Sequence, residues 1–312
     1  MPDRTIKVIF MGSPEFAVSA LDALVSSPRF DVVQVVTQPD RPKGRGKKLA
    51  PTPVKACAAE RGIPVVTMTR HDYPDVVREL VRLEPDFAAV ASFGIILKKD
   101  LLALPRHGCV NLHASLLPRY RGVSPIQAAI LAGDKETGCT TMLMDEGVDT
   151  GAILLAGSVG IEPVDTAGTL EHKLAALGAP LLARTLEGIL DGSVRPVAQD
   201  EKLASYTRKI RKEHGAINWS KDAAAIGRQI RAMLPWPTAY TTVSGRRLIV
   251  LEAAVTPNVE GEPGVFLSVS PLVVGTGGGG LELRRVKVEG KNEMTAAAFL
   301  AGYRVKPGDR LL

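Results

Sequence analysis

Two polar residues separated by one position, Asn111 and His113, end a short apolar stretch that begins at Gly108. In an extended segment, side chains two residues apart leave the same face of the backbone. In an open parallel sheet, the carboxyl ends of the strands are where substrates bind. An amide and an imidazole at that place can donate hydrogen bonds to a reacting carbonyl group. The structural alternative is that Asn111 only ends the strand and that His113 is a core histidine with its own partners.

A carboxylate completes a possible catalytic set. Asp149 lies in the turn 146–151, whose glycines can bend the turn back over the strand ends. An amide, an imidazole and a carboxylate can serve the attack of an amine on a carbonyl carbon. Asn111 would donate to the developing oxyanion, and His113 would supply a second donor or a proton for the leaving nitrogen. Asp149 would orient the imidazole or take the proton of the amine through water, unless it only closes an Asx turn.

Length and composition predict a globular chain of two domains. The 312 residues, 45% hydrophobic and 23% charged, are enough to bury two cores. The longest apolar run, residues 88–97, is too short to cross a bilayer, and the first residues resemble a strand more than a signal peptide. Cys57, Cys109 and Cys139 are scattered without zinc-ligand spacing, which suits a reducing compartment. We therefore expect a cytoplasmic protein with no membrane contact and no metal.

Strands and helices alternate through the first 190 residues, which predicts a Rossmann-like, doubly wound, mostly parallel sheet. Strands are expected at 5–11, 31–37, 64–66, 86–92, 109–113, 137–145 and 152–161, and helices after Ser13-Pro14-Glu15, at 53–61, at 72–83, near 101 and at 166–191. Ser13 is the predicted N-cap of the first helix. Because Gly12-Ser-Pro-Glu replaces the G-x-G-x-x-G loop that holds a pyrophosphate, NAD and flavin cofactors are disfavoured.

The last third of the sequence has a different character. A helix is expected within 219–234, followed by short strands at 239–243, 247–255, 264–269, 272–275, 281–287 and 309–312. Short strands at this spacing predict a small OB-like β-barrel. We therefore expect a catalytic domain over residues 1–190, a linker over 191–206 and an OB-like domain over 207–312.

Positive charge is concentrated in two places. Residues 205–312 hold 16 Lys and Arg against 9 Asp and Glu, whereas residues 1–204 hold 23 against 24. The segment after the second strand also gathers basic residues in a glycine- and proline-rich loop, namely Arg41, Lys43, Arg45, Lys47 and Lys48. Like charges so close repel one another unless a polyanion such as a phosphate backbone relieves them. Both features indicate a nucleic-acid partner, with a solvated surface as the structural alternative for each.

Several stretches in order resemble the folate-dependent formyltransferases. They are Met11–Ala17, Thr37–Lys48, Asn111–Gly122, Met144–Gly151 and Gly302–Asp309, and the likeness extends over nearly the whole chain. It is closest to the members of this family that act on methionyl-tRNA. The resemblance implies transfer of a formyl group from 10-formyltetrahydrofolate to the α-amine of methionyl initiator tRNA, without metal or NAD, for translation initiation. It also implies a monomer.

The resemblance also implies roles for individual residues. The catalytic residues of the family fall on Asn111, His113 and Asp149, and its folate-contacting loop falls on Ser115, Leu116, Leu117 and Pro118. The basic loop 41–48 corresponds to the insertion that grips the tRNA acceptor stem, with Arg45 the best single candidate. Phe16 is a candidate for the methionyl pocket, with an ordinary core position as the alternative.

Three other functions stay open from the sequence. A folate-dependent transferase acting on a nucleotide or sugar amine would use the first 190 residues equally well, but would leave the basic loop and barrel without a purpose. An RNA-binding protein with a degenerate enzyme domain would not need all of Asn111, His113 and Asp149. A nucleotide-dependent oxidoreductase is disfavoured by the loop that begins at Gly12.

Overall fold

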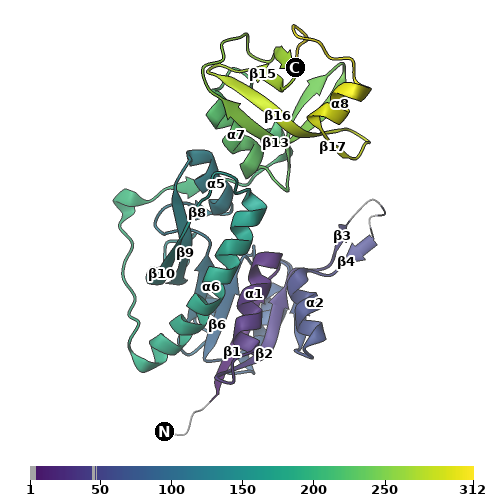
Figure 1. The fold of residues 1–312 in the computed structure, drawn as a ribbon. Coiled ribbons are helices and arrows are strands. Elements are labelled where there is room, and N and C mark those ends of the chain that lie inside the picture. Colours follow the sequence, from purple (N-terminus) through teal and green to yellow (C-terminus); the bar gives the residue numbers. More distant parts are fainter. Residues whose placement is uncertain (1–4, 44–45, 47) are drawn as a thin grey trace. The chain divides into compact units, whose positions relative to one another are not determined.

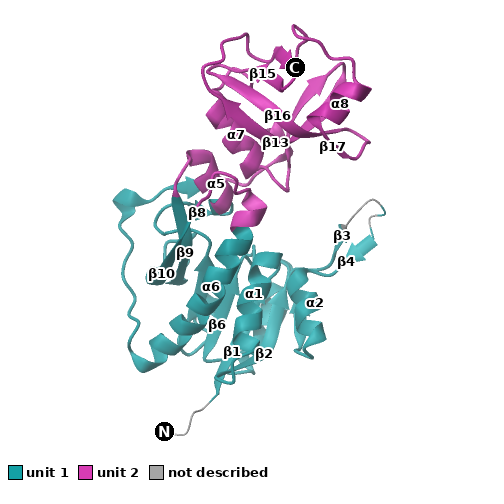
Figure 2. Cartoon of the chain, in the orientation of Figure 1, with its two compact units in different colours: residues 1–125, 136–160, 171–207 teal, residues 126–135, 161–170, 208–312 magenta. Residues whose placement is uncertain are grey.

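The chain divides into two compact units in the computed structural model, which describes residues 5–43, 46 and 48–312 (Figures 1 and 2). Unit 1 comprises residues 1–125, 136–160 and 171–207, and unit 2 comprises residues 126–135, 161–170 and 208–312. Two short stretches of the predicted catalytic domain, residues 1–190, thus belong to unit 2. Within the described residues, none of the helices combines the length and the apolar character needed to cross a bilayer.

Unit 1 is built on a sheet that has seven strands among the described residues, in the order β10-β9-β7-β6-β1-β2-β5. The strands are β1 (Ile6–Gly12), β2 (Phe30–Thr37), β5 (Val65–Thr67), β6 (Phe87–Ala91), β7 (Cys109–His113), β9 (Glu136–Leu143) and β10 (Ala152–Gly160). Neighbours from β5 to β7 are parallel, and β9 runs antiparallel to β7 and β10. The predicted Rossmann-like sheet is confirmed. Its strand order reverses between β1 and β6, where such sheets form ligand crevices.

Helices pack on both faces of this sheet (Figure 1). The helices before residue 208 are α1 (Glu15–Val25), α2 (Pro53–Glu60), α3 (Tyr73–Val81), α4 (Lys99–Leu102), α5 (Pro125–Ala132) and α6 (Ala167–Asp191). On one face, Ile9 of β1 packs in the same buried cluster as Leu80 of α3. On the other face, Gly178 of α6 lies so close to Leu112 that a Cβ at position 178 would be 2.9 Å from its side chain. The sheet is therefore buried on both sides, as its continuous apolar strands predict.

The first helix begins one residue later than the sequence predicts. Pro14 is the N-cap of α1 and makes no side-chain capping bond. Ser13, the predicted N-cap, instead accepts a hydrogen bond from the backbone N–H of Gln38 at 3.2 Å and one from the hydroxyl of Thr37 at 3.2 Å. The tertiary contact with the segment after β2 thus competes with local capping for the serine oxygen.

Among the described residues of unit 1, four further short strands lie outside the main sheet. The predicted basic loop contains an antiparallel hairpin of β3 (Arg41–Lys43) and β4 (Lys48–Ala50), and the prediction of a loop without strands is wrong there. Pro42 is compatible with this hairpin because it has only two strands and both are edges. The other pair is β8 (Arg121–Gly122) and β11 (Tyr206–Thr207), which are parallel and bring the residues after β7 against the segment after α6.

Unit 2 contains an antiparallel sheet in the order β12-β13-β16-β15-β14, with β17 paired to β16. Its strands are β12 (Ala239–Val243), β13 (Arg246–Thr256), β14 (Phe266–Val269), β15 (Leu272–Gly275), β16 (Gly280–Val288) and β17 (Glu293–Thr295), and its helices are α7 (Ala223–Ala232) and α8 (Ala296–Gly302). Two short 3₁₀ turns, Glu201–Leu203 and Lys212–Gly215, precede α7 along the chain. One buried cluster, which includes Trp219, Ile226, Phe266 and Phe299, fills the inside of the unit. The helix α8 was not predicted.

The segment 309–312 bonds to both outer strands of this sheet. The carbonyl of Asp309 accepts from the N–H of Phe266 in β14 at 2.9 Å, and the N–H of Leu311 donates to Gly264 at 2.7 Å. On the other side, Leu312 and Thr242 of β12 exchange two backbone hydrogen bonds of 2.8 and 2.9 Å. The segment forms an isolated bridge where a full strand is predicted, but it satisfies both sheet edges, as closure into a small barrel requires.

Candidate active site

Strand β7 carries two of the three predicted catalytic residues. All five of its residues are buried, and it lies between β6 and β9, with Asn111 opposite Val90 and Met142. Asn111 and His113 both line a cavity of about 480 Å³ at the carboxyl end of the parallel strands. Their two-residue spacing along a pleated strand accounts for this shared cavity.

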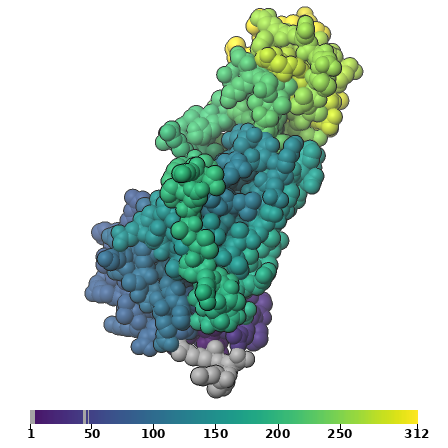
Figure 3. Space-filling model, turned by 90° about the vertical axis from the view of Figure 1, so that its left-hand side faces the viewer, coloured from purple at the N-terminus to yellow at the C-terminus, as the bar shows by residue number. Residues whose placement is uncertain are grey.

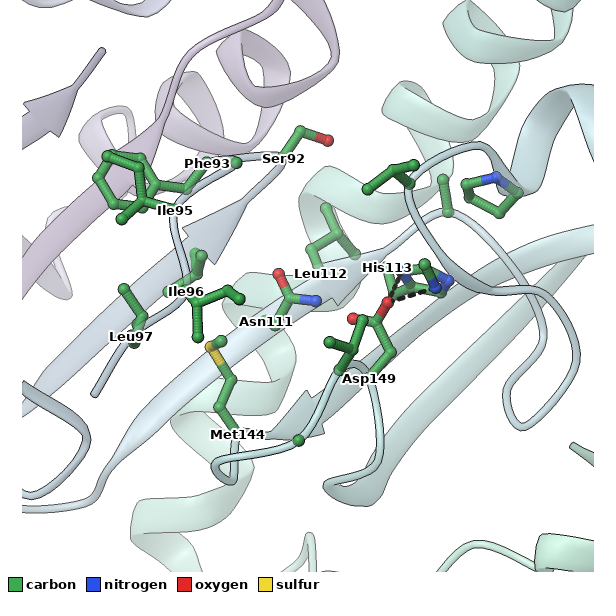
Figure 4. A pocket seen from close by; sticks show the side chains of 18 of the residues that line it. Ser92, Phe93, Ile95, Ile96, Leu97, Asn111, Leu112, His113, Met144 and Asp149 are labelled. Atoms are coloured by element: carbon green, nitrogen blue, oxygen red, sulfur yellow. Dashed lines mark hydrogen bonds and ion pairs between the residues drawn. The ribbon is translucent and has the colours of Figure 1, made fainter. Parts of the chain in front are cut away.

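The cavity has an apolar side and a polar side (Figure 4). The loop after β6 contributes Phe93, Ile95, Ile96 and Leu97, and Met144 adds a thioether. Opposite them, Figure 4 shows Asn111 in the middle of the site and His113 beside Asp149. Cavities that bind small organic molecules combine an apolar lining with a few convergent polar groups in this way.

His113 is held between a carbonyl and a carboxylate. Its Nε2 lies 3.0 Å from the carbonyl oxygen of Tyr120, and its Nδ1 lies 3.6 Å from Oδ2 of Asp149. A carbonyl only accepts, so Nε2 carries a hydrogen and Nδ1 is the nitrogen that faces the carboxylate. The His113 side chain is 7% exposed and that of Asp149 15% exposed, so little water competes for the pair.

Both the carboxylate and the backbone of Asp149 are constrained. Its Oδ2 accepts a hydrogen bond of 2.7 Å from the N–H of Gly122, and its backbone has a φ of +54°. Tyr120, which binds His113, also has a positive φ of +60°. Non-glycine residues take this conformation when the surrounding structure holds them there, and such residues cluster at functional sites.

Asn111 has an unused amide. The residue is 8% exposed, and within the described residues its side chain has no hydrogen-bond partner. Its amide atoms reach the cavity and are not among the buried side-chain atoms that lack a partner, so a ligand carbonyl in the cavity can accept from the amide without displacing a protein partner. The amide N–H₂ is therefore available as a donor to a bound molecule.

The loop predicted to contact folate lies beside this cavity but does not line it. Ser115 is fully buried and donates to the carbonyl of Arg119 at 2.6 Å, and Leu117 N–H donates to the hydroxyl of Thr140 at 3.0 Å. The peptide bond between Leu117 and Pro118 is cis. Ser115, Leu116, Leu117 and Pro118 thus form a braced turn, and their role in folate binding stays a prediction.

A second cavity, of about 430 Å³, lies at the base of the basic hairpin. Ser13, Gln38, Arg41, Thr52 and Ser92 are among its lining residues. The guanidinium of Arg41 donates to Oε1 of Gln38 at 2.6 Å.

The other residues predicted to contact the acceptor differ in how far the structure describes them. Lys48 belongs to β4 and is exposed, and Lys43 belongs to β3. Arg45 and Lys47 lie outside the described residues. Phe16 is 4% exposed within α1, as an ordinary core residue would be, and it lines neither of the two cavities described here.

The apolar side of the main cavity was not identified from the sequence as part of the site. Its signal is present, because the apolar run 88–97 continues past the end of β6 at Ala91. A buried strand that ends while the apolar residues continue indicates an apolar loop at the carboxyl edge.

The cysteines have inert environments. Burial raises the pKa of the Cys57 thiol to about 11 and those of Cys109 and Cys139 to about 12. A nucleophilic cysteine requires the opposite shift. Among the described residues, no three His, Cys, Asp or Glu side chains come together as a possible metal site.

Comparison with known proteins identifies the family. The formyl transferase model matches residues 5–186, and the model of the formyl transferase C-terminal domain matches residues 209–304. The methionyl-tRNA formyltransferase of Geobacter sulfurreducens is 43% identical over 308 residues, which cover 98% of this chain and 96% of that protein. That of Myxococcus xanthus is 44% identical over 306 residues, covering 97% of both chains.

Solved structures share the fold at lower identity. An N-formyltransferase from Helicobacter canadensis, in complex with folinic acid and dTDP-3-aminofucose, is 22% identical with a TM-score of 0.68 and covers 93% of this chain and all of its own. HypX from Aquifex aeolicus, in complex with tetrahydrofolic acid, is 15% identical with a TM-score of 0.63, over 95% of this chain and 47% of that one. The family models and the full-length relatives together show that the chain belongs to the formyl transferase family, alongside the methionyl-tRNA formyltransferases.

Proposed function

We propose that this protein is the enzyme that transfers the formyl group of 10-formyltetrahydrofolate to the α-amine of methionyl initiator tRNA, for translation initiation. Identity of 42–44% to methionyl-tRNA formyltransferases over nearly the whole chain supports this acceptor. The observation that supports the chemistry best is the convergence of Asn111, His113 and Asp149 on one half-apolar cavity.

The reaction needs an amine attack, an oxyanion and a protonated leaving nitrogen. The amine of the methionyl group attacks the formyl carbon, and the carbonyl oxygen takes up negative charge. The Asn111 amide donates to that oxygen, a contribution worth about 3–4 kcal/mol in transition states of this kind. As the bond from the formyl carbon to N10 of the folate breaks, N10 takes up a proton. The attacking α-amine gives up a proton as it becomes an amide nitrogen. The His113–Asp149 pair is the proton-carrying group on the cavity wall.

The cavity lining fits a folate. A pterin ring is flat, with apolar faces and a polar edge. The loop residues 93–97 offer apolar side chains against such faces, and Asn111 and Asp149 offer polar groups. We assign the folate to this cavity, with the turn 115–118 bracing its wall, and we expect no metal to take part.

The acceptor tRNA is assigned to the basic parts of the chain. We propose that Arg41, Lys43, Arg45, Lys47 and Lys48 contact the acceptor stem, and that Phe16 supports the methionyl pocket. Residues 1–190 would then be the catalytic domain, 191–206 the linker and 207–312 the domain that adds tRNA affinity through its excess of positive charge. We expect a monomer in the cytoplasm, where charged tRNA is used.

A sugar or nucleotide amine is the weaker alternative for the acceptor. The structural neighbours that act on sugars are 20–22% identical, which supports a shared fold and no more. The full-length relatives near 43% identity carry the methionyl-tRNA name. Membership of the formyl transferase family and the presence of Asn111, His113 and Asp149 support an enzyme over an RNA-binding protein with a degenerate enzyme domain.

One assay separates these acceptors. The purified protein is incubated with 10-formyltetrahydrofolate and, in parallel, with methionyl initiator tRNA, methionyl elongator tRNA or a dTDP-amino sugar. We expect formylmethionine after hydrolysis of the initiator tRNA, much less from the elongator, and none on the sugar. Formylated sugar without formylated tRNA would overturn the proposed acceptor.

A further inference from the structure

The segment that follows α6 returns to the catalytic residues. We call residues 197–207 the strap. It belongs to unit 1 and starts with Val197, which exchanges two backbone hydrogen bonds of 2.8 Å with Ile153. It ends in β11, which pairs with β8. Figure 3 shows the segment after α6, in green, lying along the surface of unit 1.

The side chain of Arg121 holds the strap through hydrogen bonds. Its side chain has no exposed surface, and all five of its N–H donors are used by strap residues. Nε and Nη2 donate to Oε1 of Gln199 at 3.1 and 2.9 Å, and both Nη atoms donate to the carboxylate of Glu201 at 2.9 and 2.7 Å. The fifth bond, of 2.9 Å, goes to the hydroxyl of Tyr206.

This anchoring fixes the orientation of the Gln199 amide. Because Arg121 has only donors, the atom of Gln199 that faces it must be the oxygen. The amide nitrogen therefore points the other way, where it donates to the carbonyl oxygens of Asp149 at 2.9 Å and of Gly151 at 2.7 Å. Both hydrogens of one amide thus hold the backbone of the turn that presents the Asp149 carboxylate, at a residue whose φ is +54°.

The other end of the strap holds the backbone partners of the catalytic pair. The hydroxyl oxygen of Ser205 accepts a hydrogen bond of 2.8 Å from the backbone N–H of Tyr120. The carbonyl oxygen of Ser205 accepts another, also of 2.8 Å, from the backbone N–H of Arg121. Thr207 pairs with Gly122. Tyr120 binds Nε2 of His113 through its carbonyl, and Gly122 binds Oδ2 of Asp149 through its N–H.

We propose that Gln199 is a positioning residue for Asp149, and that the strap sets the relative position of His113 and Asp149 by holding Asp149, Tyr120 and Gly122 through their backbones. The segment between the two halves of the sequence is then part of the active site. This inference rests on the proposed function, because the positioned pair is the one assigned to formyl transfer.

The decisive variant is Gln199→Glu. A glutamate keeps an acceptor for Arg121, but its carboxylate cannot donate to Asp149 and Gly151. Displacements of a catalytic group of about 1 Å can cost on the order of 100-fold in rate, so we expect kcat to fall by about 10- to 100-fold. The KM for the folate donor should change by less than about twofold, because the apolar wall of the cavity is untouched.

A double-mutant cycle distinguishes positioning from general destabilisation. If Gln199 acts through Asp149, Gln199→Glu should cost little further activity in an Asp149→Asn background. Ser205→Ala, which removes the acceptor of the Tyr120 N–H with little change in volume, should lower kcat several-fold, and this loss should vanish beside His113→Ala. This second pair keeps the test available if Gln199→Glu does not fold.

Leu203→Ala is the matched control, because Leu203 lies in the strap with an uncharged side chain that is 62% exposed. We expect its kcat to equal that of the unchanged protein. Full additivity of the Gln199 and Asp149 losses, or a rise in the folate KM at unchanged kcat, would overturn the positioning role. A wild-type protein that formylates no tRNA would instead refute the proposed function, so the two failures are distinguishable.

Discussion

At the scale of single residues, the site depends on which polar groups are already satisfied. His113 and Asp149 each have backbone partners at 3.0 and 2.7 Å, whereas the Asn111 amide has no side-chain hydrogen bond within the described residues. Groups that have protein partners are held in place, whereas an amide that faces the cavity without a protein partner is available to a ligand. This contrast supports the proposed division of labour, in which the His113–Asp149 pair carries a proton and the Asn111 amide donates to the oxyanion.

Asn111→Ala should therefore lower turnover far more than it weakens folate binding. Loss of one such donor costs about 100- to 1,000-fold in kcat, whereas we expect the folate Kd to change less than about fivefold. Single-turnover formylation and calorimetric titration with a folate measure the two quantities. Asn111→Leu, which restores most of the volume without a donor, should be equally slow. A fast leucine variant would show that shape and not the hydrogen bond is important.

At the scale of elements, we propose roles at the site for two segments outside the main sheet. An ion pair joins Glu201 of the strap to Arg121 of β8. The side chain of Arg121 is 0% exposed, whereas that of Glu201 is 68% exposed. Hydrogen bonds from Arg121 hold the pKa of the Glu201 carboxyl below its usual value of 4.5. The same carboxylate raises the pKa of Arg121 far above the range in which it could lose its proton.

The strap should therefore make a pH-dependent contribution to stability. A carboxyl whose pKa is lowered in the folded state stabilises above its ordinary pKa, and this contribution is lost as pH falls through the lowered value. Glu201→Gln should lower the free energy of unfolding at about pH 7, and the difference from the unchanged protein should shrink below about pH 4.5. Urea unfolding at several pH values measures this. A difference that stays constant into acid would contradict the assigned ion pair.

The basic hairpin is the second such segment. It follows β2 and so projects from the same edge of the sheet as the cavity. Arg45→Ala should weaken use of methionyl-tRNA and reduce the slope of log affinity against log salt by about 1, while folate binding stays the same.

Arg82→Ala is the matched control for this prediction. Arg82 carries the same charge and is exposed, and it lies between α3 and β6, at the edge of the sheet opposite the cavity. Removing its charge should leave the salt slope unchanged. Equal effects of the two changes would indicate net charge and not the hairpin.

At the scale of the whole molecule, the two units each have their own core. Both tryptophans, Trp219 and Trp236, lie in unit 2, and Trp219 is buried and donates to Thr241 at 3.0 Å. Tryptophan fluorescence therefore reports the unfolding of unit 2 alone. Leu311 belongs to the core of that unit and lies in the segment that joins its two outer strands.

Leu311→Ala should lower the free energy of unfolding of unit 2 by about 2–4 kcal/mol, the usual cost of truncating a fully buried leucine. Leu312→Ala is its neighbour and control, because Leu312 is 85% exposed, and it should cost less than about 0.5 kcal/mol. Denaturant unfolding followed by tryptophan fluorescence compares them. Equal stability of the two variants would refute the closing role of residues 309–312.

The sequence alone determines the local parts of this protein. The alternation of strand and helix patterns along the chain predicted the parallel sheet and most of its strands, because each strand and helix carries its own pattern. The spacing of Asn111 and His113 predicted that both side chains would reach one site, because the period of a strand is two residues. The motif around Asp149 predicted its chemistry by resemblance, and the structure brings its Oδ2 within 3.6 Å of His113.

Only the tertiary structure decided what depends on contacts between distant residues. Arg121 and Gln199 are separated by 78 residues, and Gln199 and Asp149 by 50, so no periodicity relates them. Ser13 does not cap the first helix as predicted, because its hydroxyl oxygen accepts the backbone N–H of Gln38, 25 positions away. The predicted linker, residues 191–206, also reaches the turn of Asp149 through Gln199, a contact that its local sequence does not indicate. Buried polar groups take whichever partners the folded backbone brings near, and a sequence records the groups but not those distances.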